Sequence, residues 1–151
     1  MRGLVQRVTQ ASVTSAATPC DAAEETGRIG AGLVLLVGVT HGDDTAAAQR
    51  LAEKVWNLRI FPDADGAMNA SCADVDGQVL VVPQFTLYGD TRKGRRPSFV
   101  AAADPGSARR LVDDVVARLR ELGATVATGR FQTHMQVSLI NDGPVTLLLE
   151  V

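Results

Sequence analysis

Cysteine and histidine are scarce in this sequence, and their scarcity removes several classes of protein. The chain contains two cysteines and two histidines, which lie far apart: Cys20, Cys72, His41 and His134. No CxxC motif, HxxxH motif or Cys/His cluster is present, so neither a disulfide framework nor a dedicated zinc site is expected. We expect two free thiols in a reducing cytoplasmic setting, with no metal and no cofactor.

Long apolar runs and a strong net charge are also missing. No stretch approaches the roughly 18 apolar residues of a membrane-spanning helix, and the start, MRGLVQRVTQASV, alternates and carries arginines, unlike a signal peptide. A cytoplasmic protein without a membrane partner is expected. The formal net charge of −2 argues against a wholly basic nucleic-acid-binding protein. Any such binding must come from a local patch.

What is present is ordinary globular composition. The chain has 151 residues, of which 46% are hydrophobic and 21% charged, and this suits one domain spanning residues 1–151. Helical spacing of apolar residues predicts two helices. One covers residues 45–57 after the capping pair Asp43-Asp44, and the other begins at Asp104-Pro105 and stops at Gly123.

Strands account for the remaining pattern. Alternation predicts a half-buried strand over 3–13, and residues 15–30 are typical of a loop or a weak hairpin. The other predicted strands are 32–39, 58–61, 77–87, 134–141 and 144–151, with a turn at 141–143 between the last two. The predicted fold class is mixed α/β. The apolar C-terminal run favours burial in the core over burial at a subunit interface.

A polar-aromatic cluster, Gln84, Phe85 and Thr86, ends the apolar run of residues 77–87. A strand end with Phe85 packed inward and its neighbours in water is the commoner explanation for such a cluster. Pro83 complicates it, because proline cannot donate to a sheet ladder and the strand must lose regular pairing there. Backbone N–H groups beyond Pro83 then become free to face a ligand.

Two further stretches are candidates for a site. Four positive charges fall within five positions, either as a solvated turn or as a grip on several backbone phosphates of a nucleic acid: Arg92, Lys93, Arg95 and Arg96. The stretch NDGPVT, residues 141–146, is either a plain β-turn or a loop with a functional Gly-Pro bond, which can be cis.

Several stretches of the chain closely resemble the D-aminoacyl-tRNA deacylases: QFTLYGDTRKGRRPSF and NDGPVTLLLEV, with QRV, LVLLVGVTHGDD, AEKVWNLRIF and HMQVSLINDG in the expected order. Only residues 15–28 depart clearly from the family, which usually has a short hairpin there. The resemblance implies a homodimer of layered β/β/α domains with mainly antiparallel or mixed sheets and two main helices. It also implies hydrolysis of the ester of D-aminoacyl-tRNA, and of glycyl-tRNA mischarged on the alanine tRNA, releasing free amino acid and tRNA.

The resemblance assigns the first motif to catalysis. Gln84, Phe85 and Thr86 match the family motif Ser-Gln-Phe-Thr, and Pro83 stands in the serine position. A related animal branch has Pro-Gln-Ala-Thr and tolerates some L-alanyl substrates. Because this chain keeps Phe85 and the Gly-Pro-Val-Thr form, we group it with the D-specific enzymes, with a deacylase of relaxed chirality as the alternative.

The second motif, Asn-x-Gly-Pro-x-Thr, is matched by Asn141, Gly143, Pro144 and Thr146. By the resemblance, a cis Gly143–Pro144 bond reaches into the partner's pocket, and Arg7 and Met135 match positions that brace this loop. Carbonyls of the loop would bind the α-amine and exclude an L side chain, whereas glycine has no side chain to exclude. The basic run would bind the tRNA.

Two mechanisms follow from the first motif. Thr86 as nucleophile would need a base, and neither histidine lies in a motif. We therefore favour an oxyanion hole made by backbone N–H groups near Phe85 and Thr86, with attack by water or by the ribose 2′-OH of the substrate. The alternatives are a non-catalytic module that binds tRNA or another RNA, and a small-ester hydrolase; DNA is not an expected partner.

Overall fold

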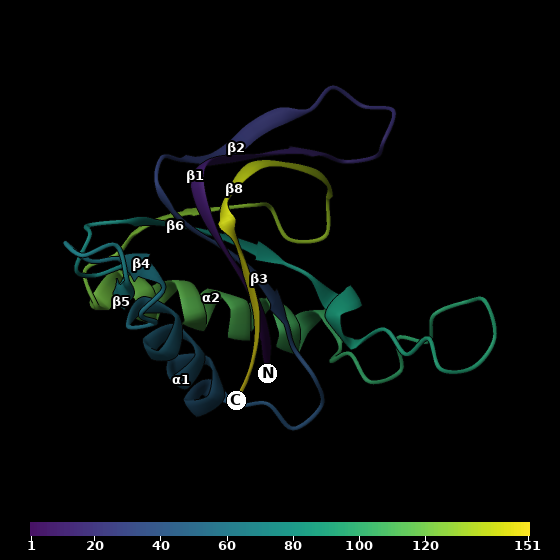
Figure 1. Ribbon diagram of the computed structural model, residues 1–151. Coiled ribbons are helices and arrows are strands. Elements are labelled where there is room, and N and C mark those ends of the chain that lie inside the picture. The colour runs from purple at the N-terminus through teal and green to yellow at the C-terminus, as the bar shows by residue number, and fades with distance from the viewer.

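The computed structural model describes residues 1–151, and a mixed six-stranded sheet forms its centre (Figure 1). Along one edge, β1 (Arg2–Ala16) pairs antiparallel with β8 (His134–Glu150). Along its other edge, β1 pairs antiparallel with β3 (Gly32–Gly38) and then with β2 (Glu24–Ile29). The strands β6 (Gln78–Pro83) and β7 (Thr125–Thr128) continue the sheet in parallel from β3.

Two helices connect the parallel strands, as such pairs require a crossover. In the chain, α1 (Thr45–Trp56) lies between β3 and β6, and α2 (Pro105–Glu121) lies between β6 and β7. Both predicted helices are confirmed with their caps, since Asp44 and Asp104 accept hydrogen bonds from backbone N–H groups of the first helical turn. A small hairpin of β4 (Phe61–Pro62) and β5 (Met68–Ala70) follows α1. No helix combines the length and apolarity needed to cross a membrane.

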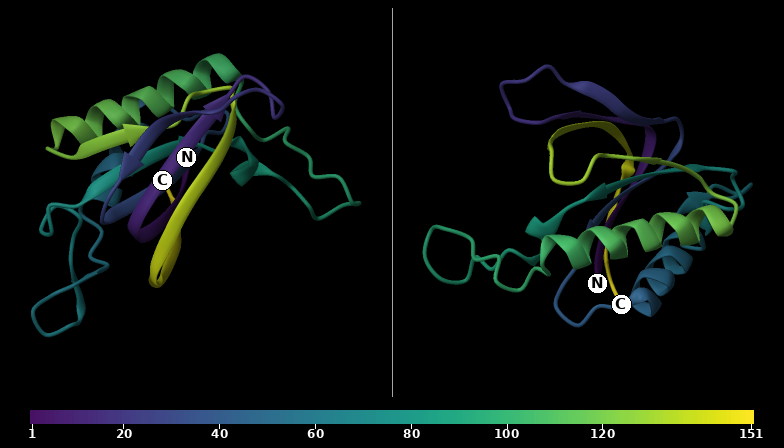
Figure 2. Two further views of the ribbon diagram at one scale, coloured as in Figure 1. Left: turned by 90° about the horizontal axis from the view of Figure 1, so that it is seen from above. Right: turned by 180° about the vertical axis from the view of Figure 1, so that it is seen from behind.

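The sheet buries side chains on both of its faces. Leu33, Leu35 and Val37 of β3 belong to the larger core, which includes apolar residues of both helices, whereas Val34 belongs to a second core on the opposite face. The second face is covered by β2 together with the adjoining parts of β1 and β8, so that the molecule has a β/β/α arrangement (Figure 2). The predicted mixed, layered fold is confirmed.

The C-terminal segment, residues 134–151, departs from the prediction of two strands and a turn. Residues on both sides of the 141–143 segment pair antiparallel with β1, in the same direction, with Asn141 opposite Val8 and Thr146 opposite Gln6. The chain therefore bulges and continues instead of reversing, and the turn prediction is wrong. Turn-forming residues favour a bend, but the register with β1 decides whether the strand resumes its direction.

Two other expectations need correction. The strand predicted over 77–87 ends at Pro83, because the residues that follow form the 3-10 helix η1 (Phe85–Tyr88). The C-terminal run is only partly in the core: Leu149 is buried and Val145 and Val151 pack against the core, whereas Leu147 and Leu148 are 38% and 53% exposed. These two exposed side chains belong to β8, which lies at the edge of the sheet and has no further strand beside it within the chain.

Candidate active site

The first motif lies where β6 stops being a strand. Pro83 is the last residue in register with β3, opposite Val37, and the Gln84 backbone N–H donates to the Val37 carbonyl at 2.7 Å. The chain then tightens into η1, in which the Gly89 N–H donates to the carbonyl of Thr86 at 2.9 Å. The loss of sheet pairing beyond Pro83, predicted from its missing N–H, is confirmed.

A cavity of about 560 Å³ opens beside this turn. Its wall is mostly apolar and comes from β3, β6, the start of α2 and the segment that leads into β8. Phe85 is 57% exposed and packs edge-on against Phe99, with ring centroids 5.0 Å apart. Gln84 and Thr133 also line the cavity. An apolar wall with a few polar groups is typical of a site for a small organic group.

The Thr86 hydroxyl has one side-chain partner, the carboxamide of Gln84, which donates a short hydrogen bond to it. No histidine or carboxylate side chain is hydrogen-bonded to this hydroxyl. An amide nitrogen cannot accept a proton from the threonine, so the observed contact orients the hydroxyl without activating it. The local chemistry favours roles for Thr86 other than that of the nucleophile.

The second motif forms the bulge of β8. The Asn141 side chain closes it from both sides, donating to the Thr146 hydroxyl at 2.7 Å and accepting from the Val145 N–H at 2.9 Å. The Gly143–Pro144 bond is cis, and Gly143 has φ of +118°, a conformation that L side chains rarely adopt. The side chains thus hold a defined loop at this position.

Arg7 holds the bulge from beneath. Its guanidinium lies 2.9 Å from the Asp142 carboxylate, donates to the Ile60 carbonyl and lies 6.0 Å from the centre of the Phe61 ring. The side chain of Arg7 is 11% exposed, so this ion pair is shielded from water on the arginine side. Met135 lies elsewhere, in the wall of the cavity near the first motif.

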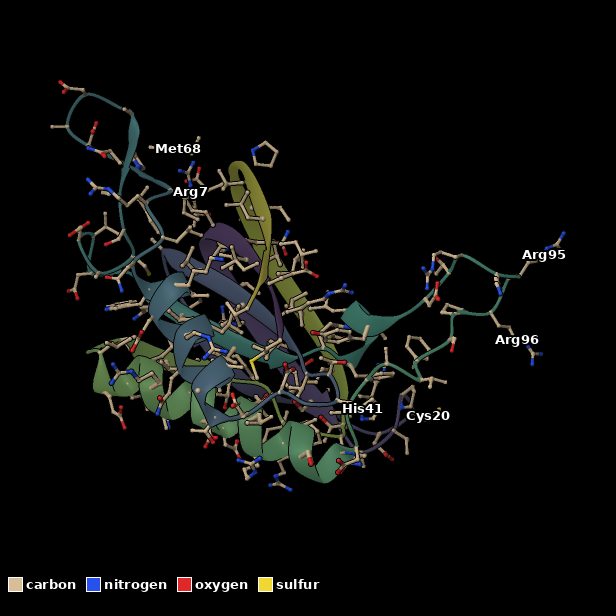
Figure 3. The ribbon with its side chains drawn as sticks, turned by 90° about the horizontal axis from the view of Figure 1, so that it is seen from below. Arg7, Cys20, His41, Met68, Arg95 and Arg96 are labelled. Carbon is tan, nitrogen blue, oxygen red and sulfur yellow. The ribbon has the colours of Figure 1, made fainter.

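The two motifs do not meet within one chain. The bulge and Arg7 lie toward the β4–β5 hairpin, whereas the cavity lies at the end of β3 and β6 that is marked by Val37 and Pro83. Figure 3 shows Arg7 near the bend in the middle of β8, while Arg95 and Arg96 lie at the far end of a loop on the opposite side. Within a single chain, the two parts of the predicted site therefore lie at opposite ends of the central sheet.

The basic run occupies that projecting loop, whose base is closed by a bridge between Asp90 and Ser98. Arg92 forms two hydrogen bonds through its side chain with the Asp90 carboxylate, and this contact lowers the pKa of Asp90 to about 2. The remaining three basic side chains are exposed and have no ion pair: Lys93, Arg95 and Arg96. Three of the four predicted charges are therefore available to an external anion.

Sequence reasoning missed several wall residues of the cavity. Val112 and Phe131 line it, yet they lie in a helix and a connecting segment without any motif, and Phe99 ends the stretch QFTLYGDTRKGRRPSF without having been assigned to the site. Only their convergence in space identifies them. A second, more polar cavity of about 500 Å³ shares Pro83, Val112 and Phe131 with the first. It extends along α2 between three arginines and three acidic residues: Arg109, Arg120, Arg130, Glu24, Glu25 and Asp113.

Fold and site together define an α/β protein with an apolar cavity beside a single 3-10 turn and with a projecting cationic loop. A family model described as "D-Tyr-tRNA(Tyr) deacylase" matches residues 4–150. This chain belongs to the D-aminoacyl-tRNA deacylase family, in agreement with the resemblance seen in the sequence.

Relatives of nearly equal length share this assignment. A D-aminoacyl-tRNA deacylase of Nocardia farcinica is 60% identical over 153 residues, covering 99% of each chain. One of Heliobacterium modesticaldum is 59% identical over 150 residues, covering 99% of this chain and 96% of the relative. Among solved structures, the "c-Myc DNA Unwinding Element Binding Protein" has a TM-score of 0.90 at 34% identity, covering 100% of this chain and 99% of that one. A "probable eukaryotic D-amino acid tRNA deacylase", with a TM-score of 0.78 at 16% identity over 99% and 98% of the two chains, shares the fold.

Proposed function

We propose that the chain is a hydrolase that cleaves the ester bond of D-aminoacyl-tRNA and thereby removes D-amino acids from the translation apparatus. Family membership supports the reaction. The apolar cavity beside η1 is the main observation that supports this location for the active site. Residues 1–151 form a single deacylase domain, because one continuous sheet connects the segments that carry the two motifs. A cytoplasmic enzyme without cofactor is expected.

The ester carbonyl binds at the start of η1. The first backbone N–H groups of a helix have no intrahelical acceptor, and those of Phe85 and Thr86 are in this position. As the carbonyl carbon becomes tetrahedral, its oxygen gains negative charge, which these two donors stabilise. Gln84 orients the Thr86 hydroxyl at the edge of the same turn. Water, or the ribose 2′-OH of the substrate, supplies the attacking oxygen.

A homodimer completes each site. The bulge that holds Gly143 and Pro144 is exposed and lies away from the cavity of its own chain. The apolar side chains along β8, among them Ile140 and Leu148, are exposed and suit contact with a second copy. In the dimer, the Gly143–Pro144 loop of one protomer enters the cavity of the other. Arg7 of the first protomer supports the loop, and Met135 of the second protomer contacts it from the cavity wall.

Chiral selection follows from the entering loop. Backbone carbonyls near Gly143 and Pro144 bind the α-amine of the substrate, and an L side chain would collide with the loop. Glycine carries no side chain, so glycyl-tRNA is also cleaved. The projecting cations, Lys93, Arg95 and Arg96, contact phosphates of the tRNA and thereby guide its acceptor end to the cavity.

A deacylation assay tests this proposal directly. The purified protein should release the amino acid from D-tyrosyl-tRNA and glycyl-tRNA at comparable rates and leave L-tyrosyl-tRNA intact. Equal cleavage of the D and L esters would contradict the chiral mechanism. Tight tRNA binding without any cleavage, unaffected by Thr86→Ala or Gly143→Ala, would instead identify an RNA-binding module.

Pro83 provides a matched variant for the same assay. Pro83→Ser restores the family motif at the end of β6 without removing a hydrogen bond, since proline has no N–H to lose. A measurable rate of the wild type on L-tyrosyl-tRNA that falls in Pro83→Ser, with the rate on D-tyrosyl-tRNA maintained, would identify the alternative of a deacylase whose chirality Pro83 relaxes. Identical D-to-L ratios in both proteins would show that chirality is set elsewhere.

A further inference from the structure

The turn that holds the proposed oxyanion hole has little support of its own. η1 contains four residues, Phe85–Tyr88, and none of them is buried. A single 3-10 turn is marginal in water because few hydrogen bonds offset the ordering of its backbone. The positions of its first N–H groups must therefore be set by contacts from outside the turn.

Gly38 provides the surface on which η1 rests. A Cβ atom at this position would lie 3.0 Å from Cβ of Leu87, 3.2 Å from the Gln84 carbonyl oxygen and 3.2 Å from Cδ2 of Tyr88. Such distances are tighter than ordinary van der Waals contact, so any larger residue would push the turn away from β3. The missing side chain of Gly38 thus sets how closely η1 approaches the sheet.

Arg2 holds the turn from the neighbouring strand, directly opposite Gly38 in the β1–β3 register. Its Nη1 donates to the Leu87 carbonyl at 2.8 Å, and its guanidinium carbon lies 4.6 Å from the centre of the Tyr88 ring. Partial burial raises the pKa of Tyr88 to about 12, so the phenol under the guanidinium stays neutral even in moderately alkaline solution.

Glu150 fixes the arginine from the other side. It is the β8 residue opposite Arg2, and its Oε1 accepts from the Arg2 Nε at 2.6 Å. The guanidinium therefore joins β8, β1 and the last two residues of η1 through three different contacts. Lysine could satisfy one of these acceptors, but it lacks the planar group that stacks on a ring and donates along two directions.

We propose that Arg2 and Gly38 are positioning residues for deacylation, which together set the direction of the Phe85 and Thr86 N–H groups through the far end of η1. The inference rests on the oxyanion hole of the proposed function. Neither residue touches the substrate: Arg2 acts on the turn through Leu87 and Tyr88, and Gly38 acts through the space it leaves.

Kinetics of four variants test the proposal: Arg2→Met, Arg2→Lys, Gly38→Ala and, as control, Arg28→Met. The control removes an exposed arginine that pairs with Glu25 on β2, far from η1. Since misplacement of reacting groups by about 1 Å can cost on the order of 10²-fold in rate, Arg2→Met should lower kcat on D-tyrosyl-tRNA by about 10- to 100-fold. Gly38→Ala displaces its neighbours by only a few tenths of an ångström and should lower kcat by about 3- to 10-fold. KM should stay within about twofold, and Arg2→Lys should recover only part of kcat.

Backbone amide NMR provides a readout that does not depend on activity. In Arg2→Met and Gly38→Ala the amide signals of Phe85 and Thr86 should shift, whereas Arg28→Met should leave them in place. Unchanged amide signals with unchanged kcat in both variants would overturn the proposal. If the wild type cleaves no D-ester, the proposed function fails, but the amide signals still decide whether Arg2 and Gly38 position the turn.

Discussion

The ion pair between Arg7 and Asp142 offers a direct test of how the Gly143–Pro144 loop is held. Asp142→Asn keeps the shape of the side chain and removes its charge. Arg7, whose side chain is 11% exposed, would then retain the Ile60 carbonyl and the Phe61 ring as neighbours but lose its carboxylate.

The magnitude follows from the separation and the exposure of the two groups. At about 4 Å between charges, the attraction is about 4 kcal/mol in a protein-surface environment and about 1 kcal/mol in bulk water. Because the side chain of Asp142 is 45% exposed, the pair lies between these limits. We expect the free energy of unfolding to fall by about 1–3 kcal/mol, which corresponds to a lower melting temperature by about 3–8 °C for a chain of this size.

Urea denaturation and deacylation measured on the same samples distinguish stability from function. If the pair positions the loop, kcat/KM on D-tyrosyl-tRNA should fall by about tenfold or more even where the variant is fully folded. Glu25→Gln breaks a solvent-exposed pair with Arg28 and serves as the control, with an unchanged melting temperature. Equal behaviour of the two variants in both assays would refute the reasoning.

Three further predictions concern separate features of the molecule. Burial raises the pKa of the Cys72 thiol from its usual 9.0 to about 12, so the unfolded chain loses this proton at lower pH than the folded chain. The free energy of unfolding should therefore decline as pH rises from 9.0 toward 12. Cys72→Ala should remove this part of the decline, as measured by urea unfolding. Leu148→Glu places a charge on the exposed apolar side of β8 and should convert the proposed dimer to monomers in analytical ultracentrifugation. Arg95→Glu combined with Arg96→Glu should raise KM for the aminoacyl-tRNA by about tenfold at low salt, with kcat nearly unchanged.

Each of these has a contrary outcome. An unaltered alkaline decline in Cys72→Ala would assign it to other groups. Dimers that persist in Leu148→Glu would place the subunit interface away from this part of β8. A fall in kcat at constant KM after the double charge reversal would mean that the projecting loop acts in the chemical step and not in binding.

The order of helices and strands can largely be predicted from the sequence because local signals agree with the fold. The caps at Asp44 and Asp104 lie next to helical spacing of apolar residues, and both helices begin where these signals predict. Pro83 ends its strand for a chemical reason that needs no structure, since it lacks an N–H for the sheet. The family and its two motifs can be recognised in the sequence for the same reason, since each motif consists of residues that are close together in the chain.

Other features depend on contacts between distant segments, and only the tertiary structure decides them. The 141–146 segment is a bulge and not a turn because both of its flanks pair with β1. The two motifs lie apart within one chain because β8 carries its bulge toward Arg7, away from the cavity at the end of β6. Arg2 and Gly38 gain their proposed role from the sheet register that places them side by side beneath η1. Register and proximity arise from the packing of the whole sheet, which no short stretch of sequence contains.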